Sequence, residues 1–239
     1  MNVKKQLLVL CVAVFVLVGC YTPLSARNMK GSLYFDLGFP QGEFKNNLDK
    51  TGLGMGLNIG VRLGNSPVVF GVDMAIMQYG EDERYESFSN IPDVTVRVVN
   101  SYNILQGHVF LRLQPFDEAA FSPYFDVLVG LNYLWAETSI KDEDWDEEDV
   151  FSTVNFDDAA LSYGFGGGVM IGLGGAKAGP AKRKVMEFFL DLRARYIFGG
   201  NAQYLQEGSI VVDGQDVTYY YSESKTDLLT FQIGVGMKF

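Results

Sequence analysis

The sequence predicts an all-β protein: an eight-stranded antiparallel up-and-down β-barrel that spans a membrane and follows a cleaved signal peptide. Three observations predict it. Apolar residues recur at every second position in eight segments, which fits a strand and not the 3.6-residue period of an amphipathic helix. Charged residues and many glycines share the opposite face of those segments. The connections between the segments alternate between short and long, as they do in transmembrane barrels.

The N-terminal segment has the features of an export signal. Lys4 and Lys5 precede an unbroken apolar run from Leu7 to Val18. The run is shorter than the roughly 20 residues of a transmembrane helix and suits the apolar core of a signal peptide. Cleavage after Ala26 would leave residues 27–239 as the barrel. A lipobox-like Leu-Val-Gly-Cys sequence instead allows residues 1–19 to be the signal and Cys20 to be lipidated.

Eight segments have an alternating apolar face. They cover residues 33–39, 53–63, 68–76, 105–113, 125–135, 161–173, 186–198 and 229–239. A soluble barrel would turn the apolar face inward. Here the apolar face is free of charge and rimmed by aromatic residues, which suits lipid, and the small residues of the other face suit a crowded interior. We therefore expect the apolar face to point outward into a bilayer.

The connections predict which end of the barrel faces which side of the membrane. The long ones lie at about 40–50, 80–92, 137–158 and 199–224. Outer-membrane barrels have long extracellular loops and short periplasmic turns. An even number of strands then leaves both termini in the periplasm. Within the last loop, Asp213-Gly214 between two β-prone runs predicts a hairpin.

The C-terminal segment resembles the signal by which outer-membrane barrels are recognised for insertion. Its alternating residues are Phe231, Ile233, Val235, Met237 and Phe239. The run Ser122–Tyr133, a Pro-Tyr step followed by a glycine-containing strand, is also similar to the OmpA/OmpX-like superfamily of small barrels, which includes OmpW-related proteins. The resemblance implies a bacterial outer-membrane location, with membrane lipid and the barrel-insertion machinery as partners. It implies no catalytic residue.

The inward face carries equal numbers of acidic and basic residues. They are Asp36, Arg62, Asp73, Arg112, Asp126, Glu187, Asp191, Arg193, Arg195 and Lys238. Buried charges require partners, and a pore selective for one ion sign would show a surplus of one charge. Eight strands also leave little room inside. We therefore predict a charge network that fills the lumen, although the interior glycines keep a narrow conduit open as an alternative.

Several functions are disfavoured. The net charge of −10 argues against nucleic-acid binding. Both cysteines lie in the N-terminal segment and His108 is the single histidine, so we expect no disulfide, metal site or cofactor. His108 faces inward without a nucleophile motif, which argues against an enzyme. The acidic stretch around Trp145 lacks the spacing of a calcium loop and is interpreted as solvated.

The predicted function follows from these points. We expect a monomeric structural and surface-interaction barrel with a filled polar lumen, whose acidic extracellular loops contact a surface or host ligand. The alternative is a narrow OmpW-like channel for small or apolar solutes.

Overall fold

The computed structural model describes residues 29–48, 50–87, 95–117, 119–141, 149–175, 187–213 and 216–238. The predicted signal peptide, Cys20, most of the acidic stretch around Trp145 and Phe239 lie outside these ranges, so the expectations for them stay predictions.

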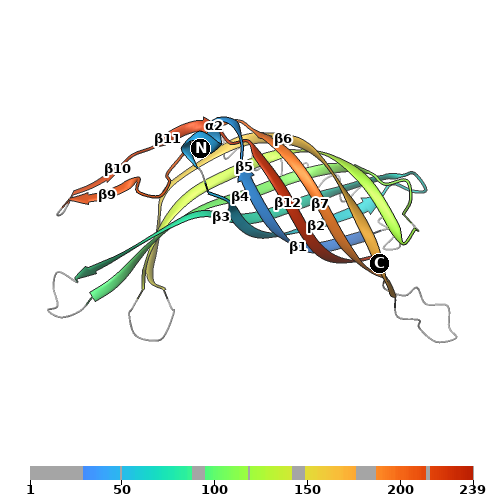
Figure 1. Ribbon diagram of the computed structural model, residues 1–239, viewed down its shortest axis with the longest axis horizontal. Coiled ribbons are helices and arrows are strands. Elements are labelled where there is room, and N and C mark those ends of the chain that lie inside the picture. Colours follow the sequence, from blue (N-terminus) through green and yellow to red (C-terminus); the bar gives the residue numbers. More distant parts are fainter. Residues whose placement is uncertain are drawn as a thin grey trace.

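The described strands form a closed antiparallel barrel in the order β1-β12-β7-β6-β5-β4-β3-β2 (Figure 1). Its members are β1 (Met29–Pro40), β2 (Gly52–Arg62), β3 (Val68–Ser87), β4 (Thr95–Leu113), β5 (Phe121–Lys141), β6 (Asp149–Gly175), β7 (Glu187–Gly199) and β12 (Leu228–Lys238). Pairing of β1 with β12, from Lys30↔Lys238 to Pro40↔Leu228, closes the ring. The predicted eight-stranded up-and-down fold is confirmed.

The two faces of the strands are divided as predicted. Phe35 is 73% exposed and Val235 is 60% exposed on the outside, whereas Tyr34 is 4% and Asp36 is 1% exposed on the inside. An apolar surface that surrounds the whole wall would be unfavourable in water and is favourable in lipid. Within the described residues, no helix is long and apolar enough to cross a membrane.

The two ends of the barrel differ in construction. At the turn end, short turns after β2 and β4 lie beside the first residues of β1 and the last of β12. At the opposite, loop end lie the helix α2 (Gly42–Asn47) and four short strands: β8 (Asn201–Tyr204), β9 (Ile210–Asp213), β10 (Asp216–Tyr219) and β11 (Ser222–Lys225). β8 pairs with β11, and β9 pairs with β10. The Asp213↔Asp216 pair confirms the predicted hairpin.

The predicted loop boundaries differ from the structure at the loop end. Residues 40–50 contain α2, and residues 199–224 contain the four short strands. Most of 80–92 and 137–158 is strand, because β3 and β4 pair as far as Ser87↔Thr95, and β5 and β6 as far as Lys141↔Asp149. Apolar alternation marks the part of a strand that contacts lipid. The backbone hydrogen-bond ladder continues beyond it, where the regular apolar alternation ends.

The continued strands form a sheet that leaves the barrel. We call the segments 79–87, 95–102, 134–141 and 149–158 the projecting sheet. Figure 1 shows β3, β4, β5 and β6 running well past the barrel wall, and the β9–β10 hairpin extending from the same end.

Candidate functional site

Charged side chains cross-link the interior of the barrel. The Arg195 guanidinium lies 3.0 Å from carboxylate oxygens of both Asp73 and Asp126. Arg112 donates two hydrogen bonds to Asp126, at 2.8 and 3.0 Å, and Arg193 lies 3.4 Å from Asp73. These residues come from β3, β4, β5 and β7, so the ion pairs tie together different parts of the wall. We call this group the interior lattice.

Two tyrosines that the sequence reasoning missed complete the lattice. The Tyr34 hydroxyl donates to Asp73 at 2.7 Å, and the Tyr124 hydroxyl donates to Asp191 at 2.5 Å. The Arg112 guanidinium carbon stands 3.7 Å above the Tyr124 ring, and that of Arg193 stands 4.1 Å above the Tyr34 ring. The sequence contained a signal for both tyrosines, because the period-2 pattern puts them on the same inward face as the charged residues.

Asp36, also on the inner face, accepts a hydrogen bond from the Gln232 amide at 2.9 Å. The structure therefore places seven of the ten predicted interior charges among buried groups: Asp36, Asp73, Arg112, Asp126, Asp191, Arg193 and Arg195.

The interior glycines accommodate these large side chains. A methyl group added at Gly56 would lie 2.5 Å from the Tyr34 hydroxyl oxygen, and one added at Gly168 would lie 2.5 Å from that of Tyr124. Such distances are far below van der Waals contact. The space beside Gly56 and beside Gly168 is thus occupied by a tyrosine ring.

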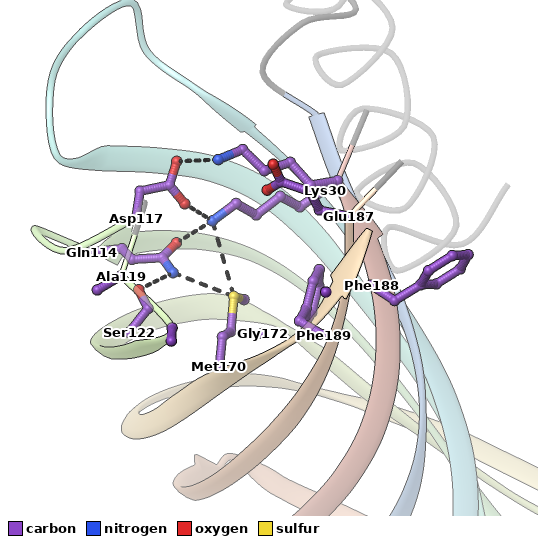
Figure 2. Close-up of a pocket in the computed structure, with 13 residues that line it drawn as sticks. Lys30, Gln114, Asp117, Ala119, Ser122, Met170, Gly172, Glu187, Phe188 and Phe189 are labelled. Carbon is purple, nitrogen blue, oxygen red and sulfur yellow. Dashed lines mark hydrogen bonds and ion pairs between the residues drawn. The ribbon is translucent and has the colours of Figure 1, made fainter. Parts of the chain in front are cut away.

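The other predicted charges, Arg62, Glu187 and Lys238, lie at the turn end, where Figure 2 shows Glu187 close to Lys30 and Asp117. Arg62 Nε lies 3.1 Å and Lys238 Nζ 3.2 Å from the same Asp117 oxygen. Lys30 Nζ donates to the other Asp117 oxygen and, at 2.8 Å, to Gln114 Oε1. We call Lys30, Arg62, Asp117 and Lys238 the mouth cluster. Glu187 is exposed at the start of β7, beside this end and away from the interior lattice.

Asp117 itself was missed because it lies in a turn. The turn between β4 and β5 brings its carboxylate to β1, β2 and β12, which lie on the other side of the ring. Burial raises the pKa of Asp117, but the hydrogen bond from Lys30 and the charges of Lys30, Lys238 and Arg62 outweigh it, and the pKa is lower than its usual value of 3.8.

We expect Asp117→Asn to lower the free energy of unfolding at pH 7 by about 1–3 kcal/mol, because hydrogen bonds to a charged group are lost. A lowered folded-state pKa stabilises the fold above the unfolded-state pKa, and that contribution is lost as pH falls through the folded-state value. The difference between wild type and variant should therefore shrink below about pH 4. Denaturant titrations from pH 7 to about pH 2.5 measure it, across the range in which carboxylates protonate. A difference that does not depend on pH would contradict the assignment.

A serine and the single histidine also meet in the interior. Ser162 Oγ lies 2.9 Å from His108 Nε2, and Asp73 stands opposite His108 in the β3–β4 register. These residue types occur together in hydrolases, and the sequence reasoning did not find the pairing with Ser162. Both side chains are buried, at 1% and 4% exposure. The pair is therefore interpreted as part of the polar interior.

Apolar side chains pack together at the loop end. Phe44 of α2 packs against Tyr204 and Tyr79, with ring centroids 5.1 and 6.3 Å apart. The Tyr79 hydroxyl donates to the Leu205 carbonyl at 3.0 Å. We call Phe44, Met77, Tyr79, Tyr102, Tyr204 and Leu205 the loop-end plug. Each is at most 4% exposed.

Several solved structures are similar to this chain at low sequence identity. No protein-family model matches the chain, and no curated protein matches it. Among solved structures, Neisserial surface protein A is similar with a TM-score of 0.41 and 11% identity over 88% of this chain and 97% of that one. A major outer membrane protein from Thermus thermophilus has a TM-score of 0.40 and 12% identity over 88% and 99%.

Ail, the attachment invasion locus protein of Yersinia pestis, has a TM-score of 0.36 and 16% identity over 89% and 97%. The assignment of the chain to the small closed barrels rests on its own strand order and on its apolar outer wall.

Proposed function

We propose that this protein is an outer-membrane barrel with a closed lumen, and that it acts through the surface displayed at its loop end. The observation that carries the proposal is that two groups of buried side chains lie one above the other inside the barrel. The loop-end plug occupies one end, and the interior lattice ties the walls together below it. These buried, hydrogen-bonded side chains support a lumen that hydrated ions do not cross.

The apolar outer wall and the arrangement of the ends support the placement in the membrane. Phe231, Ile233 and Val235 of the proposed insertion signal all point outward from β12. Both described ends of the chain lie with the short turns, which suits a periplasmic turn end and an extracellular loop end.

The projecting sheet is the part of the loop end best suited to contact a partner. Pairing of β2 with β3 ends at Leu53↔Gln78, whereas β3 continues to pair with β4 as far as Ser87, so β3 becomes an edge strand beyond the ring. Edge strands can accept an extended segment from another protein. Tyr85 on this edge is 62% exposed, and Phe151 at the start of β6 is 58% exposed. Exposed aromatic side chains are common at interfaces.

Single-channel recording in a planar bilayer tests closure of the lumen. The chain without its signal, refolded in detergent and shown by circular dichroism to be rich in strand, is expected to give no steady conductance. A general porin inserted in the same way is the positive control. Reproducible current steps would overturn the closed lumen and favour the alternative, a narrow channel for small or apolar solutes.

A further inference from the structure

A cavity of about 370 Å³ opens at the turn end, inside the rim formed by β1, β6, β7 and β12. Figure 2 shows Gln114 and Asp117 on one side of it and Phe189 on the other, with the Lys30 side chain reaching across toward Asp117 and Gln114. Ligand cavities run from about 300 to 1,000 Å³, so this one matches a small group rather than an extended molecule.

Among the described residues, the mouth cluster beside the cavity holds more cations than carboxylates, although the cavity lining itself contains Lys30, Lys238, Asp117 and Glu187. Three cations, from β1, β2 and β12, share the single carboxylate of Asp117. Their side chains are only 9%, 13% and 19% exposed. Lys30 and Lys238 stand directly opposite each other in the β1–β12 register. Like charges in that position repel, so a second anion between them would be stabilising.

Glu187 does not remove this excess. It lines the cavity and lies opposite Lys238 in the register of β7 with β12, but its side chain is exposed. Solvent and salt screen the field of an exposed charge far more than that of a buried one.

The remaining walls are fixed by contacts of their own. Gln114, which is fully buried, receives a hydrogen bond from Lys30 and donates one at 2.7 Å to Ser122 Oγ. Its amide nitrogen also lies 3.3 Å from Met170 Sδ, and Phe189 and Met170 belong to one packed cluster. Lys30 is therefore held in place before any ligand arrives, which reduces the entropy cost of binding.

We propose that this cavity binds a phosphate group, held between Lys30 and Lys238 on the side away from Asp117. Lysine ammonium groups bind phosphate as point charges, and the excess of cations over carboxylate matches its negative charge. A lipid headgroup and a soluble phosphate share this chemistry. The lipid source depends on the proposed membrane placement, and Phe188, 45% exposed on the outer wall next to the rim, would contact its glycerol or acyl region. The soluble source does not depend on that placement.

Titration calorimetry in maltoside micelles, which contain no phosphate, tests the site on the refolded chain. One arm adds inorganic phosphate and the other adds dihexanoyl phosphatidylglycerol, both at constant ionic strength. Lys238→Gln should weaken binding at least about tenfold, because it removes a charged ligand. Asp117→Asn should strengthen it several-fold, because it removes the competing anion. Lys45→Gln, the same change on exposed α2, is the matched control and should bind as wild type does.

The two arms separate the sources of the phosphate. Saturable binding of inorganic phosphate with this order of variants supports a soluble ligand, and binding of the lipid alone with the same order supports a headgroup. Absence of saturable binding in both arms, or equal affinities of wild type and Lys238→Gln, would overturn the proposal. The conductance experiment is independent of this result, so failure of the site and failure of the closed lumen are distinguishable.

Discussion

Replacing Arg195 with methionine is expected to lower the free energy of unfolding by about 3–5 kcal/mol, the usual cost of removing one partner from a buried ion pair. Arg195 is 2% exposed and bonds both Asp73 and Asp126 at 3.0 Å. Methionine has a similar reach, so the variant removes the charge without leaving a large cavity. Among the described residues, the Asp73 and Asp126 carboxylates would then have only Arg193 and Arg112 as cationic partners. A buried charge with too few partners is unfavourable.

Equilibrium unfolding by urea, in lipid vesicles and followed by tryptophan fluorescence, measures this loss. Arg97→Met is the matched control, because Arg97 lies on the projecting sheet, 32% exposed and 3.6 Å from Glu83. Exposed pairs contribute up to about 1 kcal/mol, so the control should differ little from wild type. Equal losses in the two variants would mean that the interior lattice does not stabilise the barrel.

The second large effect is expected from Gly168→Val. An added Cβ would lie 2.5 Å from the Tyr124 hydroxyl oxygen and 2.6 Å from the Leu192 carbonyl oxygen of the neighbouring strand. The tyrosine is held by its hydrogen bond to Asp191 and by the Arg112 guanidinium above its ring. Neither the ring nor the strand can move freely, so we expect a loss of about 1–3 kcal/mol from overpacking.

Gly107→Val supplies the control for this prediction. It places the same side chain on β4, where an added Cβ meets nothing within 4 Å. Valine also has a higher strand propensity than glycine, so this variant should be as stable as wild type or more so. The same urea titration compares the two. A Gly168→Val barrel as stable as Gly107→Val would show that the interior holds spare volume, and it would reopen the conduit that the glycines suggested in the sequence.

The period-2 pattern predicted correctly which face of each strand points outward, but it did not predict how far the strands extend. Each transmembrane segment was predicted from residues whose outward side chains contact lipid, and the faces are assigned correctly from Leu33 to Val235. Beyond the apolar wall, the regular alternation of outward apolar residues ends. Residues 80–87 and 149–158 were therefore predicted as loops, although their backbones remain paired.

The period-2 pattern could not predict which interior side chains contact one another. Arg195 and Asp73 lie on β7 and β3, which are not neighbours in the ring and meet only across the lumen. Asp117 is in a turn, where strand alternation does not predict which way a side chain points. Its carboxylate pairs with cations from three strands. Ser162 was predicted to face inward, but its contact with His108 depends on how β6 and β4 are placed around the ring.

The sequence by itself therefore determined the fold class, the strand number and the side of each strand that faces lipid, because these follow from local alternation along one strand. Tertiary structure decided which interior glycines lie against large side chains, since that depends on which residue faces each glycine from another strand. It also decided where charge is in excess, because the mouth cluster exists only once β1, β2 and β12 are closed into a ring and the β4–β5 turn is placed across its end.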